Sequence, residues 1–254
     1  MKNHFWILVL LAAAACARAQ QLPTAEELVP RIVAYAQQYR QRVPSLEADE
    51  SAVSQQLKGG KVKWEVRLEM TERVLRDDSD PNGFVDRYTF NSVDGKTPAP
   101  HFKMPYFVQG VFSNAVGFAR REQQACFEYY VSAGDRPTTA TLQMWVKPGR
   151  RAPGCEDVFE DYHKTLVVDI ASGTILHLTR SMSARAAREN HEIVFIELDY
   201  ALQKLGDESF WLPAHFTARD EKNEHRMMAS YSNYHRYTGT AKIVSSEPVP
   251  EVVP

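Results

Sequence analysis

Residues 61–71 (KVKWEVRLEMT) alternate apolar and polar side chains without a break, which limits the fold more than any other stretch of the chain. A period of two is typical of a β-strand with one buried and one solvated face. Antiparallel sheets commonly have this asymmetry, whereas strands of parallel sheets are buried on both faces. The sequence therefore predicts an antiparallel sheet covered on one side. The apolar positions are Val62, Trp64, Val66, Leu68 and Met70.

Eight further segments have the composition of strands, and most are joined by short turns. Consecutive strands joined in this way pair in antiparallel orientation. We expect about nine strands in one sheet and an α+β fold. Besides the strand that begins at residue 61, they are 84–90, 125–132, 139–147, 166–170, 175–183, 191–203, 210–219 and 225–238.

Two segments have the character of helices that could cover the sheet. In residues 23–43, apolar side chains recur at three- and four-residue steps, and Thr24 precedes two glutamates as at a helix N-terminus. Residues 106–121 are apolar on nearly all sides, as in a buried helix. Residues 47–58 are polar and predict a second short helix or a loop. The sequence therefore predicts two or three helices against the buried face of the sheet.

The N-terminus reads as an export signal. Residues 5–15 form an apolar run of 11, too short for a bilayer, which requires about 20 residues. Ala17-Arg18-Ala19 has the small-x-small pattern of a cleavage site, so residues 1–19 are the predicted signal peptide. In the alternative, Cys16 ends a lipobox-like segment and is lipidated. Residues 20–245 would form a single domain, and the Pro-rich residues 246–254 a disordered tail.

Charge and cysteine content agree with export. The net charge is −2, and loss of Lys2 and Arg18 with the signal would make it −4, which argues against a nucleic-acid partner. Cys126 and Cys155 would be the cysteines left in an oxidising compartment, where an isolated pair usually forms a disulfide. We therefore expect no free catalytic thiol.

No motif of a known catalytic or metal site is present in the sequence. The acidic residues of 156–161 beside His163 match no standard metal-ligand spacing and predict a solvated loop. Glu197 and Asp199 would share one face of a strand, where paired carboxylates are usually exposed. We therefore expect no catalytic residue, no metal and no cofactor, and a protein that is not an enzyme.

Two segments resemble a known superfamily. Residues 167–178 (VVDIASGTILHL) resemble a hairpin of bacterial envelope proteins, and Asp199-Tyr200 followed by residues 210–216 (FWLPAHF) resembles the strand pair after it. Both are similar to periplasmic lipoprotein carriers of the LolA and LolB type, and more closely to uncharacterised secreted bacterial proteins of that shape. The resemblance covers about residues 60–240. It implies a strongly curved antiparallel sheet, like an unclosed barrel, wrapped on helices.

That resemblance also implies a function. We expect a periplasmic or envelope protein that binds a lipid or a lipoprotein acyl chain in a cavity between sheet and helices. Contact with the membrane would be peripheral, or through a lipid anchor at Cys16. One alternative is an interaction protein with a fully packed interior, and another is a secreted hydrolase. The predicted cavity lining is Trp64, Phe107, Val111, Phe112, Phe195 and Trp211.

Overall fold

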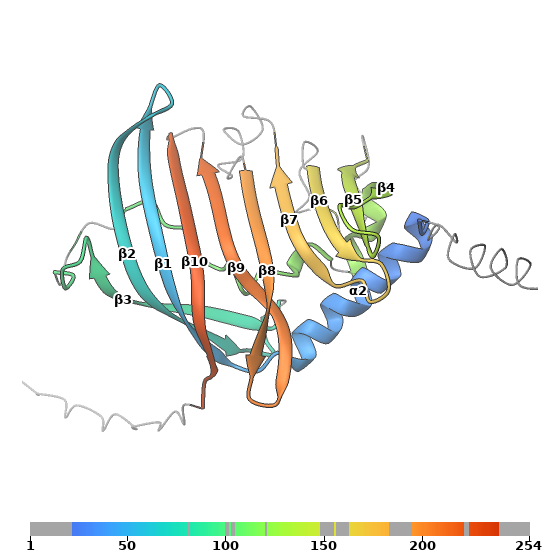
Figure 1. The fold of residues 1–254 in the computed structure, drawn as a ribbon, viewed down its shortest axis with the longest axis horizontal. Helices are drawn as coiled ribbons and strands as arrows, with labels where there is room; N and C mark the ends of the chain where they lie inside the picture. The colour runs from blue at the N-terminus through green and yellow to red at the C-terminus, as the bar shows by residue number, and fades with distance from the viewer. Residues whose placement is uncertain are drawn as a thin grey trace, which may run out of the picture.

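The computed structural model describes residues 22–80, 82–99, 102, 105–119, 121–147, 155, 163–182, 195–220 and 224–238. Ten antiparallel strands form one sheet in the order β3-β2-β1-β10-β9-β8-β7-β6-β5-β4, which leaves β3 and β4 as free edges. The strands curve together around one side (Figure 1). The predicted antiparallel, unclosed sheet is therefore confirmed. In the described part of the chain, no helix has the length and apolar character needed to cross a membrane.

One α-helix, two 3₁₀ turns and ten strands make up the described part of the chain. The helix is α2 (Ala25–Arg42), and two 3₁₀ turns are η1 (Gly117–Ala119) and η2 (Arg121–Cys126). The strands are β1 (Leu46–Lys58), β2 (Lys61–Arg76), β3 (Phe84–Val93), β4 (Phe127–Ala133), β5 (Thr139–Val146), β6 (His163–Asp169), β7 (Ile175–Ser181), β8 (Phe195–Leu205), β9 (Glu208–Asp220) and β10 (His225–Arg236).

Helix α2 spans the inner side of the curved sheet. Its buried stripe is Leu28, Ile32, Ala36 and Tyr39, as the sequence periodicity predicts. Near one edge, Ile32 lies with Phe127 of β4 around a small pocket. Near the other, the Tyr39 ring meets the Phe84 ring of β3 edge-on, with centroids 6.1 Å apart. One helix therefore reaches both free edges of the sheet.

The prediction of a helix or loop over 47–58 is wrong, because this segment forms strand β1. It pairs with β2 on one side and β10 on the other, and is the third strand from the β3 edge of the sheet. Its inward-facing residues include Ala48, Glu50, Ala52 and Ser54, all buried. Small and polar side chains at these positions conceal the apolar alternation that normally marks a strand.

The predicted helix over 106–121 is also wrong. Residues 111–116 are a series of turns and are followed by η1 and η2, so α2 is the single α-helix among the described residues. Gly110 has φ +80°, in the left-handed region that interrupts a right-handed helix. The segment is nonetheless buried, because it crosses the inner side of the sheet on the way from β3 to β4 (Figure 1). We call residues 106–119 the strap.

The predicted disulfide is confirmed. Cys126, at the end of η2, is bonded to Cys155, and the Cα atoms are 5.8 Å apart. The predicted signal peptide, Cys16 and the C-terminal tail lie outside the described residues, and so do residues 156–161 of the predicted acidic loop.

Candidate functional site

The strap is fastened to the inner face of the sheet by individual side chains. On β1, the Ser54 hydroxyl donates to the Tyr106 carbonyl at 2.7 Å. On β3, the Tyr88 hydroxyl accepts from Gly110 N at 2.9 Å, and Asp86 Oδ2 accepts from Ser113 N at 3.1 Å. These contacts satisfy backbone groups that would otherwise be buried without a partner. They also explain why polar residues occupy inward-facing positions of the sheet.

The second half of the strap is held by one side chain of β8 and one of α2. The Tyr200 hydroxyl of β8 donates to the Ala115 carbonyl, and Arg40 of α2 donates to the Val116 carbonyl at 3.5 Å. Between these anchors the strap buries Val111, Phe112, Ala115 and Val116 in the core. The strap is thus an apolar plug held in place by polar contacts from several separate elements.

Three carboxyl groups lie beneath the strap on adjacent strands. Glu50 of β1 pairs with Met70, Glu72 of β2 pairs with Tyr88, and Asp86 of β3 pairs with Val74. The three acids therefore step diagonally across the inner face, one inward-facing position per strand. Glu50 and Glu72 are buried. Among the described residues, Glu50 Oε2 and Asp86 Oδ1 have no hydrogen-bond partner, whereas the Glu72 carboxyl interacts with the hydroxyl of Tyr88 on the neighbouring strand.

Burial favours the neutral form of these acids. It raises the pKa of Glu50 to about 8, against a weaker opposing effect of the hydrogen bond from Tyr231. Burial, and then the nearby Asp86 and Glu50 carboxylates, raise the pKa of Glu72 well above its ordinary value. The pKa of Asp86 is raised to about 6 by burial, although the donors of Ser113 oppose the shift. The raised pKa values favour the protonated form of Glu50 and Glu72 at neutral pH, whereas a pKa of about 6 leaves Asp86 mainly ionised there.

Aromatic rings enclose the acids on the inner side. Phe112 of the strap meets Tyr231 and Tyr234 of β10 edge-on, with ring centroids 5.3 Å and 5.9 Å apart. Phe107 makes the same kind of contact with Tyr88 at 4.9 Å. This part of the inner space is consequently apolar in bulk and polar only at hydroxyl and carboxyl groups.

A small apolar pocket lies between α2 and strands β4, β5 and β6. Its cavity volume is about 10 Å³, room for about one water molecule. Ligand pockets for drug-sized molecules begin at about 300 Å³. The pocket is lined by Val29, Ile32, Val33, Ala119, Gln123, Gln124, Phe127, Tyr129, Leu142, Met144 and Leu166.

None of the six residues of the predicted lining borders that pocket. Phe107, Val111 and Phe112 belong to the strap and face the core, as described above. Trp211 is half-buried on β9, opposite the exposed Leu202 of β8.

The other two residues of the predicted lining lie away from the covered inner space. Phe195 is on the outer face of β8, where the Arg219 guanidinium lies 4.2 Å from the centre of its ring. It therefore cannot line a space between sheet and helix. Trp64 is 45% exposed near the end of the β1–β2 hairpin. It lies one inward-facing position beyond Val66, the strand partner of the Ser54 that holds the strap.

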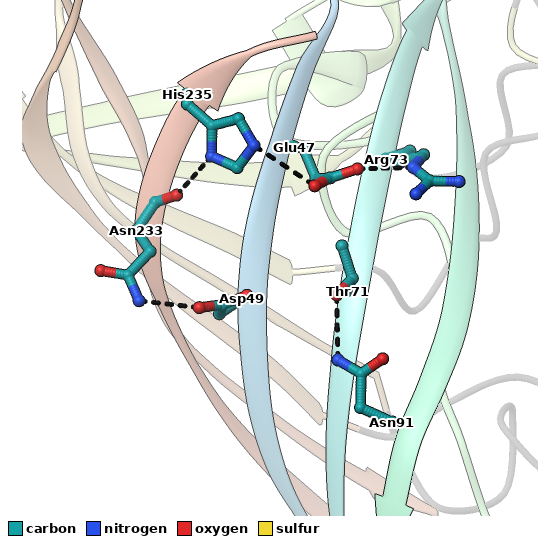
Figure 2. A network of polar contacts seen from close by, with 7 residues as sticks. All are labelled: Glu47, Asp49, Thr71, Arg73, Asn91, Asn233 and His235. Carbon is teal, nitrogen blue, oxygen red and sulfur yellow. Dashed lines mark hydrogen bonds and ion pairs between the residues drawn. The ribbon is translucent and has the colours of Figure 1, made fainter. Parts of the chain in front are cut away.

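The outer face of β10, β1, β2 and β3 carries a separate polar network (Figure 2). Glu47 accepts from Arg73 Nε at 2.5 Å and lies 3.2 Å from His235 Nε2. The Asn233 amide donates to Asp49 at 2.7 Å, and the Asn91 amide donates to Thr71 at 2.9 Å. These contacts join neighbouring strands on a solvated surface, so we assign them to strand pairing. Figure 2 shows both amide hydrogen bonds, from Asn233 to Asp49 and from Asn91 to Thr71.

Glu197 and Asp199 share the outer face of β8, as predicted, and both meet His177 of β7. His177 Nδ1 lies 2.6 Å from Asp199 Oδ1, and Nε2 lies 3.7 Å from Glu197 Oε1. The histidine thus joins two strands and engages both carboxylates. Among the described residues, no group of three or more His, Cys, Asp or Glu side chains is placed to hold a metal ion.

Sequence reasoning missed the three inner acids, although one carried a signal. The period-two pattern that begins at Val62 continues to Val74, and Glu72 occupies one of its inward-facing positions. An acid in the buried register of a long strand indicates a charged or protonated group in the core. No comparable pattern marks Glu50 or Asp86. Residues 47–58, around Glu50, lack the apolar alternation of a strand, and polar and apolar residues do not alternate in the short segment around Asp86, residues 84–87.

Comparison with known proteins gives similarity in structure only. No protein-family model and no curated protein matches this chain. Similar solved structures include a DUF1329 family protein from Desulfovibrio piger, with 12% identity over 85% of this chain and 95% of that one, at a TM-score of 0.42. A putative outer membrane lipoprotein-sorting protein domain from Vibrio parahaemolyticus has 10% identity, coverages of 84% and 95%, and a TM-score of 0.46.

A LolA superfamily protein from Nitrosomonas europaea is also similar, with 10% identity, coverages of 85% and 96%, and a TM-score of 0.39.

Proposed function

We propose that this chain is an exported, non-enzymatic envelope protein that binds a lipophilic ligand, such as a lipid or a lipoprotein acyl chain, between its sheet and inner cover. The observation that carries the proposal is the strap. It fills the inner face with apolar side chains, yet the hydrogen bonds that join its described residues to the sheet are made largely by individual side chains such as Ser54, Asp86 and Tyr200.

A strap of this kind can be displaced without disrupting the sheet. Lifting it breaks a few hydrogen bonds and exposes its buried apolar side chains, a cost that the bound acyl chain would have to offset, whereas the pairing of all ten strands is made elsewhere. An entering acyl chain would occupy the surface left by Val111, Phe112 and Val116 and would gain about 0.8 kcal/mol for each buried methylene. The apolar pocket beside α2 is a place where such a chain could begin to enter.

The proposal is tested by lipid extraction of protein purified from its own envelope and by uptake of a fluorescent fatty acid. Phe112→Ala removes a buried ring from the strap and should increase the affinity for the fatty acid severalfold, because it leaves apolar space. Phe195→Ala, the same deletion on the outer face, is the matched control and should leave uptake unchanged.

The alternative of a fully packed interaction protein is favoured by one observation, the pocket volume of about 10 Å³. The same experiment separates the two functions. Absence of extracted lipid, together with absence of uptake by both the unmodified chain and the Phe112→Ala variant, would overturn the carrier function and favour the packed protein.

Attachment to the envelope is a separate part of the proposal. Cleavage after Ala19 would release a free protein that begins at Gln20, whereas lipidation of Cys16 would tether the same domain to a membrane. The mass of the mature N-terminal peptide distinguishes the two, because only the second carries acyl groups.

A further inference from the structure

The β1–β2 hairpin ends in an exposed tip, which we define as residues 58–64. Gly59 and Gly60 make the turn with φ of +58° and +78°, and a Cβ on either would meet no atom within 4 Å. Every residue from Lys58 to Trp64 is exposed. Figure 1 shows this hairpin projecting past the adjacent ends of β10 and β9. The tip is therefore accessible to a large flat partner.

The tip combines two exposed apolar side chains with three lysines. Val62 and Trp64 are 49% and 45% exposed and lie beyond the buried part of β2. The pairing of β1 with β2 shifts by one residue within the tip, so strict alternation does not divide it into two faces. Lys61 and Lys63 flank Val62 in the sequence, and Lys58 pairs across the hairpin with Lys61. Apolar side chains this exposed have no internal packing to account for them.

The acidic side chains near the tip are already engaged. Glu224 accepts from Gly59 N at 2.9 Å, and Glu65 accepts from Gln55 at 2.7 Å. The ion pairs of the described residues do not include the three tip lysines. The whole chain has a net charge of −2, so the tip is a local concentration of positive charge on an otherwise slightly acidic protein.

We propose that the tip is a membrane-docking element that binds the surface of an anionic lipid bilayer. Tryptophan prefers the boundary between headgroups and acyl chains, where its ring is apolar and its N–H is hydrated. Val62 would enter the same layer beside Trp64, and the lysines would lie among the lipid phosphates. Each lysine near such a surface strengthens binding roughly fivefold. The contact is reversible, and salt weakens it by screening the lysine charges.

The test is co-sedimentation of the chain that begins at Gln20 with vesicles. Vesicles of three parts phosphatidylcholine to one part phosphatidylglycerol should bind the protein at low salt, whereas pure phosphatidylcholine vesicles should bind it much more weakly. Binding should fall as sodium chloride is added. The triple variant Lys58→Gln, Lys61→Gln, Lys63→Gln should bind the anionic vesicles on the order of 100-fold more weakly.

The apolar part is tested with Trp64→Ser, which should weaken binding about tenfold, since it removes the main interfacial anchor. Trp145→Ser is the matched control, because Trp145 of β5 is also 45% exposed but lies far from the hairpin in the strand order. In a Trp145→Phe, Trp211→Phe background, emission of Trp64 should shift to the blue and be quenched by brominated lipid. All these positions are at least partly exposed, and unfolding curves verify that the variants fold.

Equal binding to both kinds of vesicle, or full binding by the triple lysine variant, would overturn the proposal. Retention on immobilised heparin without vesicle binding would also overturn it and would indicate a polyanion or an acidic protein as the partner. The inference is independent of the proposed ligand in the interior. A tip variant that no longer sediments with vesicles should still take up the fluorescent fatty acid.

Discussion

The hydroxyl of Tyr200 on β8 donates to the carbonyl of Ala115 in the middle of the strap, and both residues are buried. The bond joins a central strand to the segment that fills the inner face. Because Tyr200 and Ala115 are 85 positions apart in the chain, this contact forms only when the strap has packed against the sheet. The contribution of this hydrogen bond to stability therefore measures how firmly the strap is held on the inner face.

Tyr200→Phe should lower the free energy of unfolding by about 1–3 kcal/mol, because it leaves the buried Ala115 carbonyl without a donor. Urea denaturation measures the change. Tyr130→Phe is the control, since Tyr130 is exposed on β4, and should change stability by less than about 0.5 kcal/mol. Equal effects of the two changes would mean that the Tyr200 bond does not hold the strap.

The inner acids predict that the protein loses stability as pH rises. Glu50 is more easily protonated when folded than when unfolded, because burial raises its pKa from the ordinary 4.5 to about 8. The folded state therefore binds the extra proton between these values. Stability is fully present below about pH 4.5 and falls as pH rises through 8. Asp86 adds a loss at lower pH, since burial raises its pKa to about 6.

Glu50→Gln should remove much of this dependence, because the amide stays neutral throughout. Between pH 6 and pH 9 the variant should lose less unfolding free energy than the unmodified chain by at least about 1.4 kcal/mol, the equivalent of one pKa unit. Thermal unfolding across that range measures it. Glu69→Gln, on the exposed face of β2, should keep the unmodified pH profile. If the unfolding free energy of Glu50→Gln fell with pH as steeply as that of the unmodified chain, the raised pKa of the buried Glu50 would be contradicted.

The third prediction concerns the contribution of the disulfide to stability. Cys126→Ala with Cys155→Ala should lower the free energy of unfolding by about 3 kcal/mol, because the bond closes a loop over a sequence separation of 29 residues. Denaturation with and without dithiothreitol measures the loss. Reductant should destabilise the chain that begins at Gln20 and should not affect the double variant, which has no bond to reduce. Two free thiols in the folded chain would contradict the bond.

Local patterns were enough to predict most of the sheet. Nine strands follow from alternation and turn composition, and the stripe of α2 follows from its helical period. Strand β1 was missed because its inward-facing residues include Ala48, Glu50 and Ser54, whose burial depends on partners far along the chain. Periodicity does not reveal the burial of Glu50, because its own strand lacks the apolar alternation that would mark the inward-facing positions.

The strap was misjudged for a related reason. Apolar side chains on all sides indicate burial correctly, and the core does contain Val111, Phe112 and Val116. The backbone conformation, however, is set by long-range anchors such as Ser54, Tyr88 and Asp86 rather than by local propensity. The predicted lining therefore combined strap residues that are packed in the core with Phe195, whose outer position follows from its register with Arg219.

The contact between the β6–β7 turn and α2 gives the fourth prediction. Gly173 has φ +71°, and a Cβ there would lie 2.4 Å from Arg31 C and 2.7 Å from Ile32 N. The same turn is joined to the helix by Arg31, which donates to the Ile170 carbonyl at 2.7 Å. Gly173→Ala should therefore force the helix away from the sheet and cost more than about 2 kcal/mol of unfolding free energy.

Gly95→Ala separates backbone strain from this close approach. Gly95 has φ +73°, but its Cβ would meet nothing within 4 Å. Its cost should be the left-handed conformation alone, about 1–2 kcal/mol. The excess at Gly173 then measures how tightly α2 is seated on the sheet, and equal losses in urea denaturation would mean that the helix can move away freely. Because α2 reaches both free edges of the sheet, a large excess would show that close seating of this helix contributes to the stability of the whole unclosed sheet.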